Sequence, residues 1–275
     1  NNDRRELAGK VAIVTGAGRM RGIGRATAGV LARLGSDVVV TGTGRDPESF
    51  PKDEKEAGWR DIQSTAEEVE TYGVRALPIV SNVADETDVQ RMISDVVAEF
   101  GRLDAIVNNA AAPYGDDRVA VLDMPTAAFK KVVDVKLMGT FYCSKAAATL
   151  MIRQGDGGRI VNLSSTMGKS GRVNTSAYNA ANFAVDGFTQ SLAKELGPQG
   201  IRVNAIAPGW IDSGMARIAL AKAPARQDKI VSRTPMQRLG DDIDIGAAAV
   251  YLCSPAAQFV TGTTHVVDGG VSIGF

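Results

Sequence analysis

The feature that most constrains the fold is a strand, a glycine-rich turn, a helix and a second strand in direct succession near the start of the chain. Residues 11–15 are a short β-branched run typical of a fully buried strand. The glycine turn covers 15–24, a helix is expected from about 25 to 34, Gly35 ends it, and 38–41 form the second strand. Glycines let the backbone approach a pyrophosphate, whose charge then rests on the helix N-terminus. The order therefore predicts an α/β fold with a doubly wound parallel sheet and helices on both faces.

The rest of the chain continues the alternation. Strand patterns recur at 75–80, 105–110, 158–165, 201–209 and 265–270, and helical patterns at about 62–72, 86–100, 126–154, from about 178, and at 243–252. No repeat, linker or low-complexity segment interrupts the series, so residues 1–275 are expected to form a single domain. Two segments stand apart from the pattern: a polar insertion at about 44–62, and a mixed helical segment at about 210–238 that is expected to cover the substrate.

Composition narrows the class of protein. The 31 basic and 31 acidic side chains balance, so the bulk charge favours neither nucleic acid nor an acidic membrane surface. No apolar run approaches the roughly 20 residues that span a bilayer, and the N-terminal residues lack the apolar core of a signal peptide, so a cytoplasmic protein is expected. Cys143 and Cys253 can form one disulfide, but buried free thiols are favoured. A single histidine, His265, excludes a His-based metal cluster, so no metal is expected, and it disfavours a Ser-His-Asp hydrolase.

The chemistry-bearing pattern is a serine at the end of a strand and a tyrosine at the start of a helix. Ser165 ends the run 158–165, Tyr178 follows thirteen positions later, and Asn182 lies four residues further on the same helix face. The spacing resembles the active site of the short-chain dehydrogenase/reductase family, where a lysine follows the tyrosine at the position of Asn182. The family's catalytic asparagine position is held here by Lys136. The two side chains are therefore exchanged.

The resemblance covers roughly residues 7–270 and implies a Rossmann-type fold, a nicotinamide cofactor and a homotetramer or homodimer formed through the long helices. The glycine turn is two residues longer than the common family pattern, and Asn82 stands where the family has an aspartate that contacts adenine; its amide oxygen can accept the same hydrogen bond. One asparagine of the Asn108-Asn109 pair is expected to brace the central strands. The resemblance implies these cofactor-binding residues: Gly16, Arg19, Gly22, Ile23, Gly24, Thr43, Arg45, Asn82, Val83, Asn109, Ala110, Tyr178, Asn182, Pro208, Gly209, Ile211 and Ser213.

The catalytic hypothesis concerns a proton and a charge. A tyrosine hydroxyl has an ordinary pKa of about 10, and a cation within roughly 4–6 Å favours tyrosinate. By the resemblance, Tyr178 is the acid/base and Ser165 orients the substrate oxygen. Asn182 can reach ribose hydroxyls but carries no charge, so Lys136 is predicted to supply it from the neighbouring helix. The stripe at 126–154 also allows a lysine that extends to solvent, but the family position favours an inward one.

The sequence favours NADP over NAD, although NAD remains possible. A carboxylate at the end of the second strand would bind the ribose diol of NAD, but no carboxylate occurs from 41 to 45. Thr43 and Arg45 could instead hold the 2′-phosphate, with Arg19 or Arg21 adding charge. The insertion at 44–62 is either a solvated surface segment, the reading that the sequence favours, or a flap beside the adenosine.

We expect a nicotinamide-dependent oxidoreductase that interconverts a secondary alcohol and a ketone. The pocket candidates Ala112, Tyr114, Met167 and Trp210 favour a substrate with a hydrophobic body, whereas Lys169 and Arg172 would favour an anionic one. A non-catalytic NAD(P)-binding sensor or partner protein is the alternative, because the usual lysine is missing. A lyase or dehalogenase-like use of Ser165 and Tyr178 without nicotinamide is a third possibility.

Overall fold

Parallel strands form the centre of the computed structural model, which describes residues 5–223 and 225–273. In this part of the chain seven strands pair in the order β3-β2-β1-β4-β5-β6-β7, and all pairings are parallel. The strands are β1 (Val11–Val14), β2 (Asp37–Gly42), β3 (Ala76–Val80), β4 (Ala105–Asn108), β5 (Gly158–Leu163), β6 (Ile201–Pro208) and β7 (Thr264–Val267). The predicted doubly wound sheet is confirmed.

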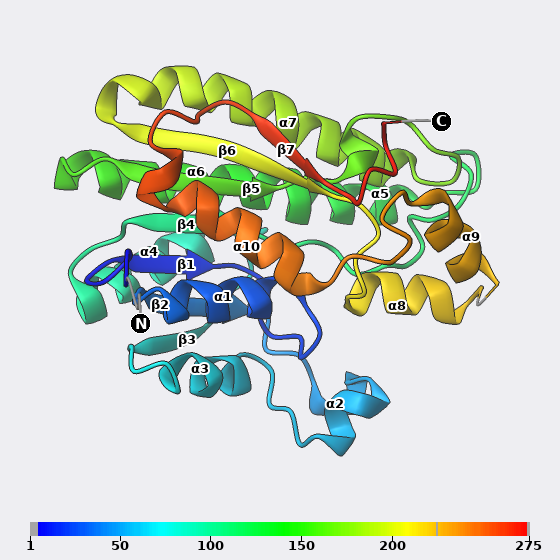
Figure 1. Ribbon diagram of the computed structural model, residues 1–275, viewed down its shortest axis with the longest axis horizontal. Helices are drawn as coiled ribbons and strands as arrows, with labels where there is room; N and C mark the ends of the chain where they lie inside the picture. Colours follow the sequence, from blue (N-terminus) through cyan, green and yellow to red (C-terminus); the bar gives the residue numbers. More distant parts are fainter. Residues whose placement is uncertain (1–4, 224, 274–275) are drawn as a thin grey trace.

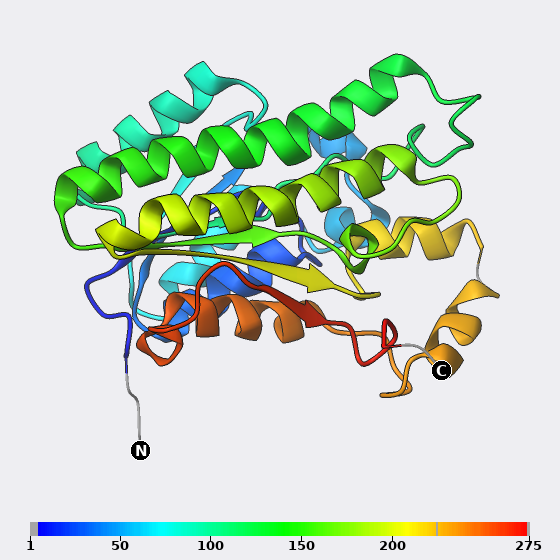
Figure 2. The same ribbon diagram turned by 90° about the horizontal axis from the view of Figure 1, so that it is seen from above.

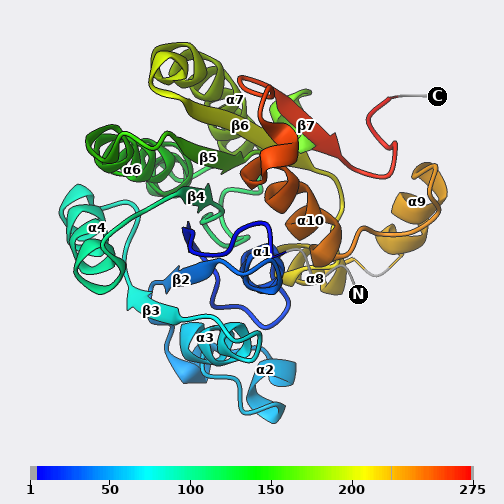
Figure 3. The same ribbon diagram turned by 60° about the vertical axis from the view of Figure 1, so that its left-hand side comes forward.

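Helices cover both faces of the sheet. The helices are α1 (Ile23–Arg33), α2 (Lys52–Glu56), α3 (Ile62–Glu70), α4 (Glu86–Phe100), α5 (Thr126–Val133), α6 (Gly139–Gln154), α7 (Ser176–Leu196), α8 (Gly214–Ala221), α9 (Arg226–Arg233) and α10 (Asp242–Cys253). Seen along the sheet, α4, α6 and α7 lie on one face and α1, α3 and α10 on the other (Figure 3). The short helix α2 projects beside α3, and α8 and α9 lie at the end toward which the arrow of β6 points (Figure 1).

Strand β1 shows why the sheet is buried on both sides. All four of its residues are buried and apolar, and successive side chains point to opposite faces. Ala12 and Val14 join the core beneath α1 and α10, whereas Val11 and Ile13 join the core beneath α4 and α6. A continuous apolar run is therefore required here, because alternation with polar residues would bury polar groups on one face.

Local capping sets the helix ends. The side chain of Asp85 accepts hydrogen bonds from the backbone N–H groups of Thr87 and Asp88, and Gly101 ends α4 with a φ of 72°. Such an N-cap contributes about 1 kcal/mol, and glycine adopts the left-handed conformation without a steric penalty. The predicted helix at 86–100 is found with the same bounds.

The long helix predicted at 126–154 contains an irregular turn. Helix α5 continues into a π-helical turn, Asp134–Met138, and then into α6, and Lys136 lies in the middle of that turn. The green ribbon still runs as one rod beside α7 (Figure 2). Single π turns inside α-helices occur often at functional sites, and this one changes the direction of side chains toward α7.

The remaining sequence predictions concern isolated residues. Cys143 and Cys253 are buried free thiols, and burial raises the pKa of each to about 12. His265 is a residue of β7 and packs edge-on against Tyr251. Within the described residues, every helix is too short or too polar to cross a bilayer.

Candidate active site

A cleft of about 1270 Å³ opens at the carboxyl ends of the strands. The chain runs outward from β1 to β3 and then returns to β4 on the other side of β1, so the connections diverge next to this cleft. Such a crevice is where doubly wound sheets bind ligands. Every residue that the sequence predicted for catalysis or cofactor binding lines the cleft, except Asn182.

The glycine turn presents free backbone donors to the cleft. Gly16 has a φ of 67°, and a Cβ added to it would lie 2.8 Å from the Cα of Ala110. The N-cap of α1 is Gly22, no side chain caps the helix, and its first turn holds no acidic residue. The N–H groups at this helix end therefore remain available for an anion. This geometry fits the pyrophosphate of a dinucleotide.

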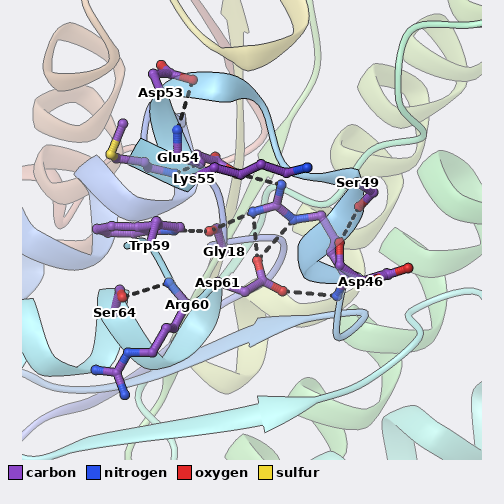
Figure 4. Close-up of polar contacts among 12 residues, drawn as sticks. Gly18, Asp46, Ser49, Asp53, Glu54, Lys55, Trp59, Arg60, Asp61 and Ser64 are labelled. Carbon is purple, nitrogen blue, oxygen red and sulfur yellow. Dashed lines mark hydrogen bonds and ion pairs between the residues drawn. The ribbon is translucent and has the colours of Figure 1, made fainter. Parts of the chain in front are cut away.

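The lengthened glycine turn and the polar insertion pack against each other (Figure 4). Trp59 Nε1 donates to the carbonyl of Gly18 at 2.7 Å, and Thr65 Oγ1, on the adjacent helix α3, donates to that of Ala17 at 2.7 Å. The backbone N–H of Met20 donates to Glu54 Oε1 at 3.0 Å. The two departures from the family pattern are thus one structural unit. The insertion therefore packs against the glycine turn at the edge of the cleft, and its outer surface is exposed.

Arg45 is the centre of this unit. Its guanidinium donates to Asp61 Oδ1 from Nε at 3.1 Å and from Nη2 at 2.9 Å, and to Glu54 Oε2 from Nη1 at 2.9 Å. It also lies 4.5 Å from the ring centroid of Phe50. Arg21 Nε is 3.8 Å from Asp53 Oδ2. Arg45 is therefore already paired with two carboxylates, and a phosphate would have to compete with them for its guanidinium.

Asparagines fix the edges of the cleft. Asn108 Nδ2 donates to Asn162 Oδ1 at 2.8 Å and to Ser144 Oγ at 2.9 Å, which ties β4 to β5 and α6 as expected of the bracing residue. Asn109 Nδ2 donates to the carbonyls of Thr15 and Gly16, each at 2.9 Å. Asn82 and Val83 line the cleft beyond β3, where the Asn82 Oδ1 accepts the N–H of Ala84 at 3.1 Å.

Ser165 and Tyr178 both line the cleft. Ser165 Oγ accepts the backbone N–H of Met167 at 3.2 Å, which leaves its proton available. Asn179 Nδ2 holds the intervening loop by donating to the carbonyls of Met167 at 2.5 Å and Ser170 at 2.8 Å. Asn179 escaped the sequence analysis because an asparagine inside a helix carries no distinctive pattern. It positions Ser165 relative to Tyr178.

Lys136 points inward, as the family position indicated. Lys136 is 4% exposed and lines the cleft. Within the described chain no carboxylate oxygen lies within 4.0 Å of its ammonium nitrogen. Burial lowers the pKa of Lys136 to about 8, and the charge of Asp186 acts in the opposite direction. A buried amine of this kind can change protonation state near neutral pH.

Asn182 was predicted in the cleft as a catalytic and ribose-binding residue, and the structure corrects this. The residue is fully buried and is absent from the cleft wall. Its Nδ2 donates to the backbone carbonyl of Tyr178 at 2.8 Å, one turn back in α7. A short amide reaches its own helix backbone more easily than it reaches the cleft. A lysine at this position would extend further.

A cation that the sequence analysis missed lies beside Tyr178. Arg118, from the loop after β4, places its guanidinium 4.0 Å from the Tyr178 ring centroid. Its side chain is largely buried, and Nη1 is 3.2 Å from Asp117 Oδ2, an ion pair without hydrogen-bond geometry. No periodic pattern marks this loop, so only the tertiary fold reveals the contact.

The substrate end is mostly apolar. The four predicted pocket residues line it together with Met215 and Ile218 of α8. Lys169 and Arg172 do not line it, and Lys169 instead lies 3.1 Å from Asp186 Oδ2. Charge at this end comes from Arg118 and from Arg226, which lies 5.1 Å from the Trp210 ring centroid.

The fold and the cleft define a class of protein, a dinucleotide-binding oxidoreductase with a serine and a tyrosine at the reactive end. Residues 16–272 match the model of the family described as enoyl-(acyl carrier protein) reductase. The chain belongs to the short-chain dehydrogenase/reductase family and is an NAD(P)-dependent enzyme of that family.

Curated relatives and solved structures agree over nearly the whole chain. A 3-oxoacyl-[acyl-carrier-protein] reductase of Staphylococcus aureus is 37% identical over 262 residues, which cover 95% of this chain and 98% of that protein. An A-factor type γ-butyrolactone 1′-reductase of Streptomyces virginiae is 37% identical over 267 residues, 97% of each chain. A crystal structure of a protein provisionally described as a short-chain alcohol dehydrogenase from Sinorhizobium meliloti 1021 matches with a TM-score of 0.87 and 32% identity, covering 99% of this chain and 100% of that one.

Proposed function

We propose that the protein interconverts a secondary alcohol and a ketone with a nicotinamide dinucleotide, within a single domain. The observation that carries this proposal is that Ser165, Tyr178 and Lys136, from three different elements, line one cleft together with the glycine turn. Both curated relatives are named as reductases, one of a 3-oxoacyl group and one of a γ-butyrolactone, which supports a ketone as the substrate class.

The nicotinamide, when bound, supplies or accepts the hydride. The protein residues manage the proton and the position of the substrate oxygen. Ser165 Oγ donates a hydrogen bond to that oxygen, and the Tyr178 hydroxyl gives it a proton during reduction or takes one during oxidation. Lys136 stabilises the tyrosinate form, and Arg118 adds positive charge over the ring.

The segment at 210–238 acts as the substrate lid in this proposal. Helices α8 and α9 line the outer wall of the cleft through Met215 and Arg226, and Ile211 bridges to Gly240 at the base of the segment. Apolar contact with Tyr114 and Trp210 favours a hydrophobic substrate body. The exposed Phe129, Phe141 and Phe183 of the long helices support the expected homodimer or homotetramer, which light scattering would measure.

The deciding experiment is a panel of secondary alcohols and ketones with Tyr178→Phe as the test variant. We expect turnover by the wild type and a loss of roughly 10²–10⁴-fold in the variant, with dinucleotide binding retained. Tyr251→Phe is the matched control, because Tyr251 lies on α10 outside the cleft wall.

Dinucleotide binding by the wild type without turnover of any panel member would favour the non-catalytic sensor or partner. The presence of Ser165, Tyr178 and Lys136 in one cleft supports the enzyme instead. A reaction that proceeds without any dinucleotide would favour the lyase-like alternative, which the fit of the α1 N-terminus to a pyrophosphate argues against.

A further inference from the structure

No acidic residue occurs at the end of β2 in the sequence, but the fold brings the carboxylate of Asp61 next to it. Gly42 is the last residue of β2, and a Cβ added to it would lie 3.6 Å from Asp61 Oδ2. A Cβ added to Gly18 in the glycine turn would lie 1.8 Å from Asp61 Oδ1. The Asp61 carboxylate thus fills the space between the end of β2 and the glycine turn, and Asp61 lines the cleft.

We propose that Asp61 replaces the acidic residue missing from the end of β2, so that the protein selects NAD over NADP. This inference rests on the proposed function, because it requires that the cleft binds a nicotinamide dinucleotide. A carboxylate accepts hydrogen bonds from the two hydroxyls of the adenosine ribose, whereas it repels a phosphate on the 2′-oxygen. The insertion at 44–62 thereby sets the cofactor preference.

The backbone conformation of Asp61 indicates that its side chain does more than cap helix α3. Asp61 occupies the N-cap position of α3, where an aspartate usually accepts a hydrogen bond from the helix N–H groups, but its side chain does not cap α3. Its φ of 56° and ψ of −130° lie in a region that residues with a Cβ rarely adopt. The fold maintains this strained conformation and turns the carboxylate toward Gly18 instead.

The carboxylate is held in a fixed position. Asp61 Oδ1 accepts from Arg45 Nε and Nη2, and Oδ2 accepts from the backbone N–H of Arg45 at 3.2 Å. The Asp61 side chain is 8% exposed and that of Arg45 is 17% exposed. Oδ1 already accepts two hydrogen bonds, whereas Oδ2 accepts one and can accept another. Asp61 can therefore bind a ribose hydroxyl without losing its hold on Arg45.

Two of the three arginines predicted for a phosphate are paired with carboxylates of the insertion. Arg45 is paired with Asp61 and Glu54, and Arg21 lies near Asp53. Arg19 also lines the cleft, and its Cδ is 2.8 Å from a Cβ added to Gly214 at the start of α8. A 2′-phosphate would bring up to about two negative charges toward Asp61, and it would have to compete with carboxylates for Arg45 and Arg21.

The test is the affinity of the purified protein for NADH and for NADPH, measured by calorimetry without substrate. We expect the wild type to bind NADH at least about tenfold more tightly. Asp61→Asn keeps the shape of the side chain and removes its charge, so NADH should bind roughly tenfold more weakly and the preference should disappear. Circular dichroism establishes that each variant is folded.

Two further variants separate a direct role from an indirect one. Glu56→Gln removes an exposed carboxylate of the same insertion that pairs only with Lys52 among the described residues and should leave both affinities within about twofold. Glu54→Gln removes the other partner of Arg45, but Glu54 does not line the cleft. A loss of NADH preference in Glu54→Gln equal to that in Asp61→Asn would show that Asp61 acts only through Arg45, and would overturn the inference.

The wild-type measurement needs no variant and separates the two proposals. Tighter binding of NADPH than of NADH overturns the role of Asp61 and leaves the proposed oxidoreductase intact. Equal binding of both also overturns it. Binding of neither dinucleotide overturns the proposed function itself.

Discussion

At each end of the cleft, we propose that a charged side chain from another segment replaces the one the family usually has, and the two ends differ in how that side chain is held. At the adenosine end, the carboxylate absent from Gly42 is present on Asp61, which is bound by Arg45 through three hydrogen bonds. At the catalytic end, the cation absent from position 182 is present on Lys136, which is buried with no carboxylate within 4.0 Å in the described structure. Both charges come from another segment of the chain.

The difference relates to what each charge is proposed to do. A binding group needs a fixed position and a constant charge, and pairing with an arginine provides both. A group that assists proton transfer needs a pKa near the working pH, and burial without a partner lowers the pKa of Lys136 to about 8. Asp61 at the adenosine end is therefore held in one position with a constant charge, whereas Lys136 at the catalytic end can gain or lose a proton near the working pH.

The largest expected effect is on turnover at the catalytic end. Lys136→Ala removes the cation proposed to stabilise tyrosinate, so turnover should fall by about 10²-fold or more and the basic limb of the pH–rate profile should move to higher pH. Steady-state kinetics across pH would measure both. The control is Lys145→Ala, an exposed lysine of α6 that pairs with Glu86.

The exchange itself can be reversed. If the Lys136→Asn single variant is inactive, Lys136→Asn with Asn182→Lys should recover part of the turnover, because a lysine at position 182 extends beyond the reach of the asparagine amide. An unchanged pH–rate profile in Lys136→Ala would contradict the proposed role of Lys136 and remove the contrast between the two ends.

The second effect is on stability. The pKa of Lys136 is about 8 in the folded protein and 10.5 in its ordinary state, so between these pH values the unfolded chain binds more protons and wild-type stability rises with pH. Below pH 8 the buried charge costs about 3 kcal/mol. Lys136→Met should therefore raise the free energy of unfolding by about 3 kcal/mol near pH 7, and this gain should shrink as the pH approaches 10.5.

Urea denaturation at several pH values measures this difference, with Lys145→Met as the exposed control. Equal stability of Lys136→Met and the wild type near pH 7 would mean that the ammonium is solvated or paired in solution. The charge of Lys136 would then be stabilised like that of Asp61, and the two ends would no longer differ in this respect.

The smallest effect concerns Arg118. Replacing Arg118 by Met, together with Asp117→Asn so that no buried carboxylate is left unpaired, removes the cation over the Tyr178 ring. A cation–π contact contributes about 0.5–2 kcal/mol, so kcat should fall by roughly 2- to 30-fold. A change in KM alone would assign Arg118 to substrate binding instead, and a loss as large as that of Lys136→Ala would make Arg118 the main source of charge.

Regular patterns allowed the fold and most of the candidate site to be predicted. The apolar runs at β1 and β6 and the spacing of Ser165 and Tyr178 are local features, so the sequence shows them directly. The pairing of Arg45 with Asp61 and Glu54 could not be predicted, because the sequence places Arg45 in a loop and does not show which carboxylates surround it. The prediction for Asn182 was wrong because helical periodicity gives a face but not the rotamer of a short amide.

By itself the sequence determined the doubly wound sheet, the glycine turn and the identity of the two hydroxyl residues, because strand and helix periodicities are set by neighbours along the chain. Only the tertiary structure decided that Asp61 faces Gly18, that Arg118 covers Tyr178 and that Arg45 is paired with Asp61 and Glu54. These contacts join loops or helices far apart in sequence, and no periodic pattern records them. They form only when the whole fold has packed, because packing fixes the distance between these segments and therefore which charged side chains can meet.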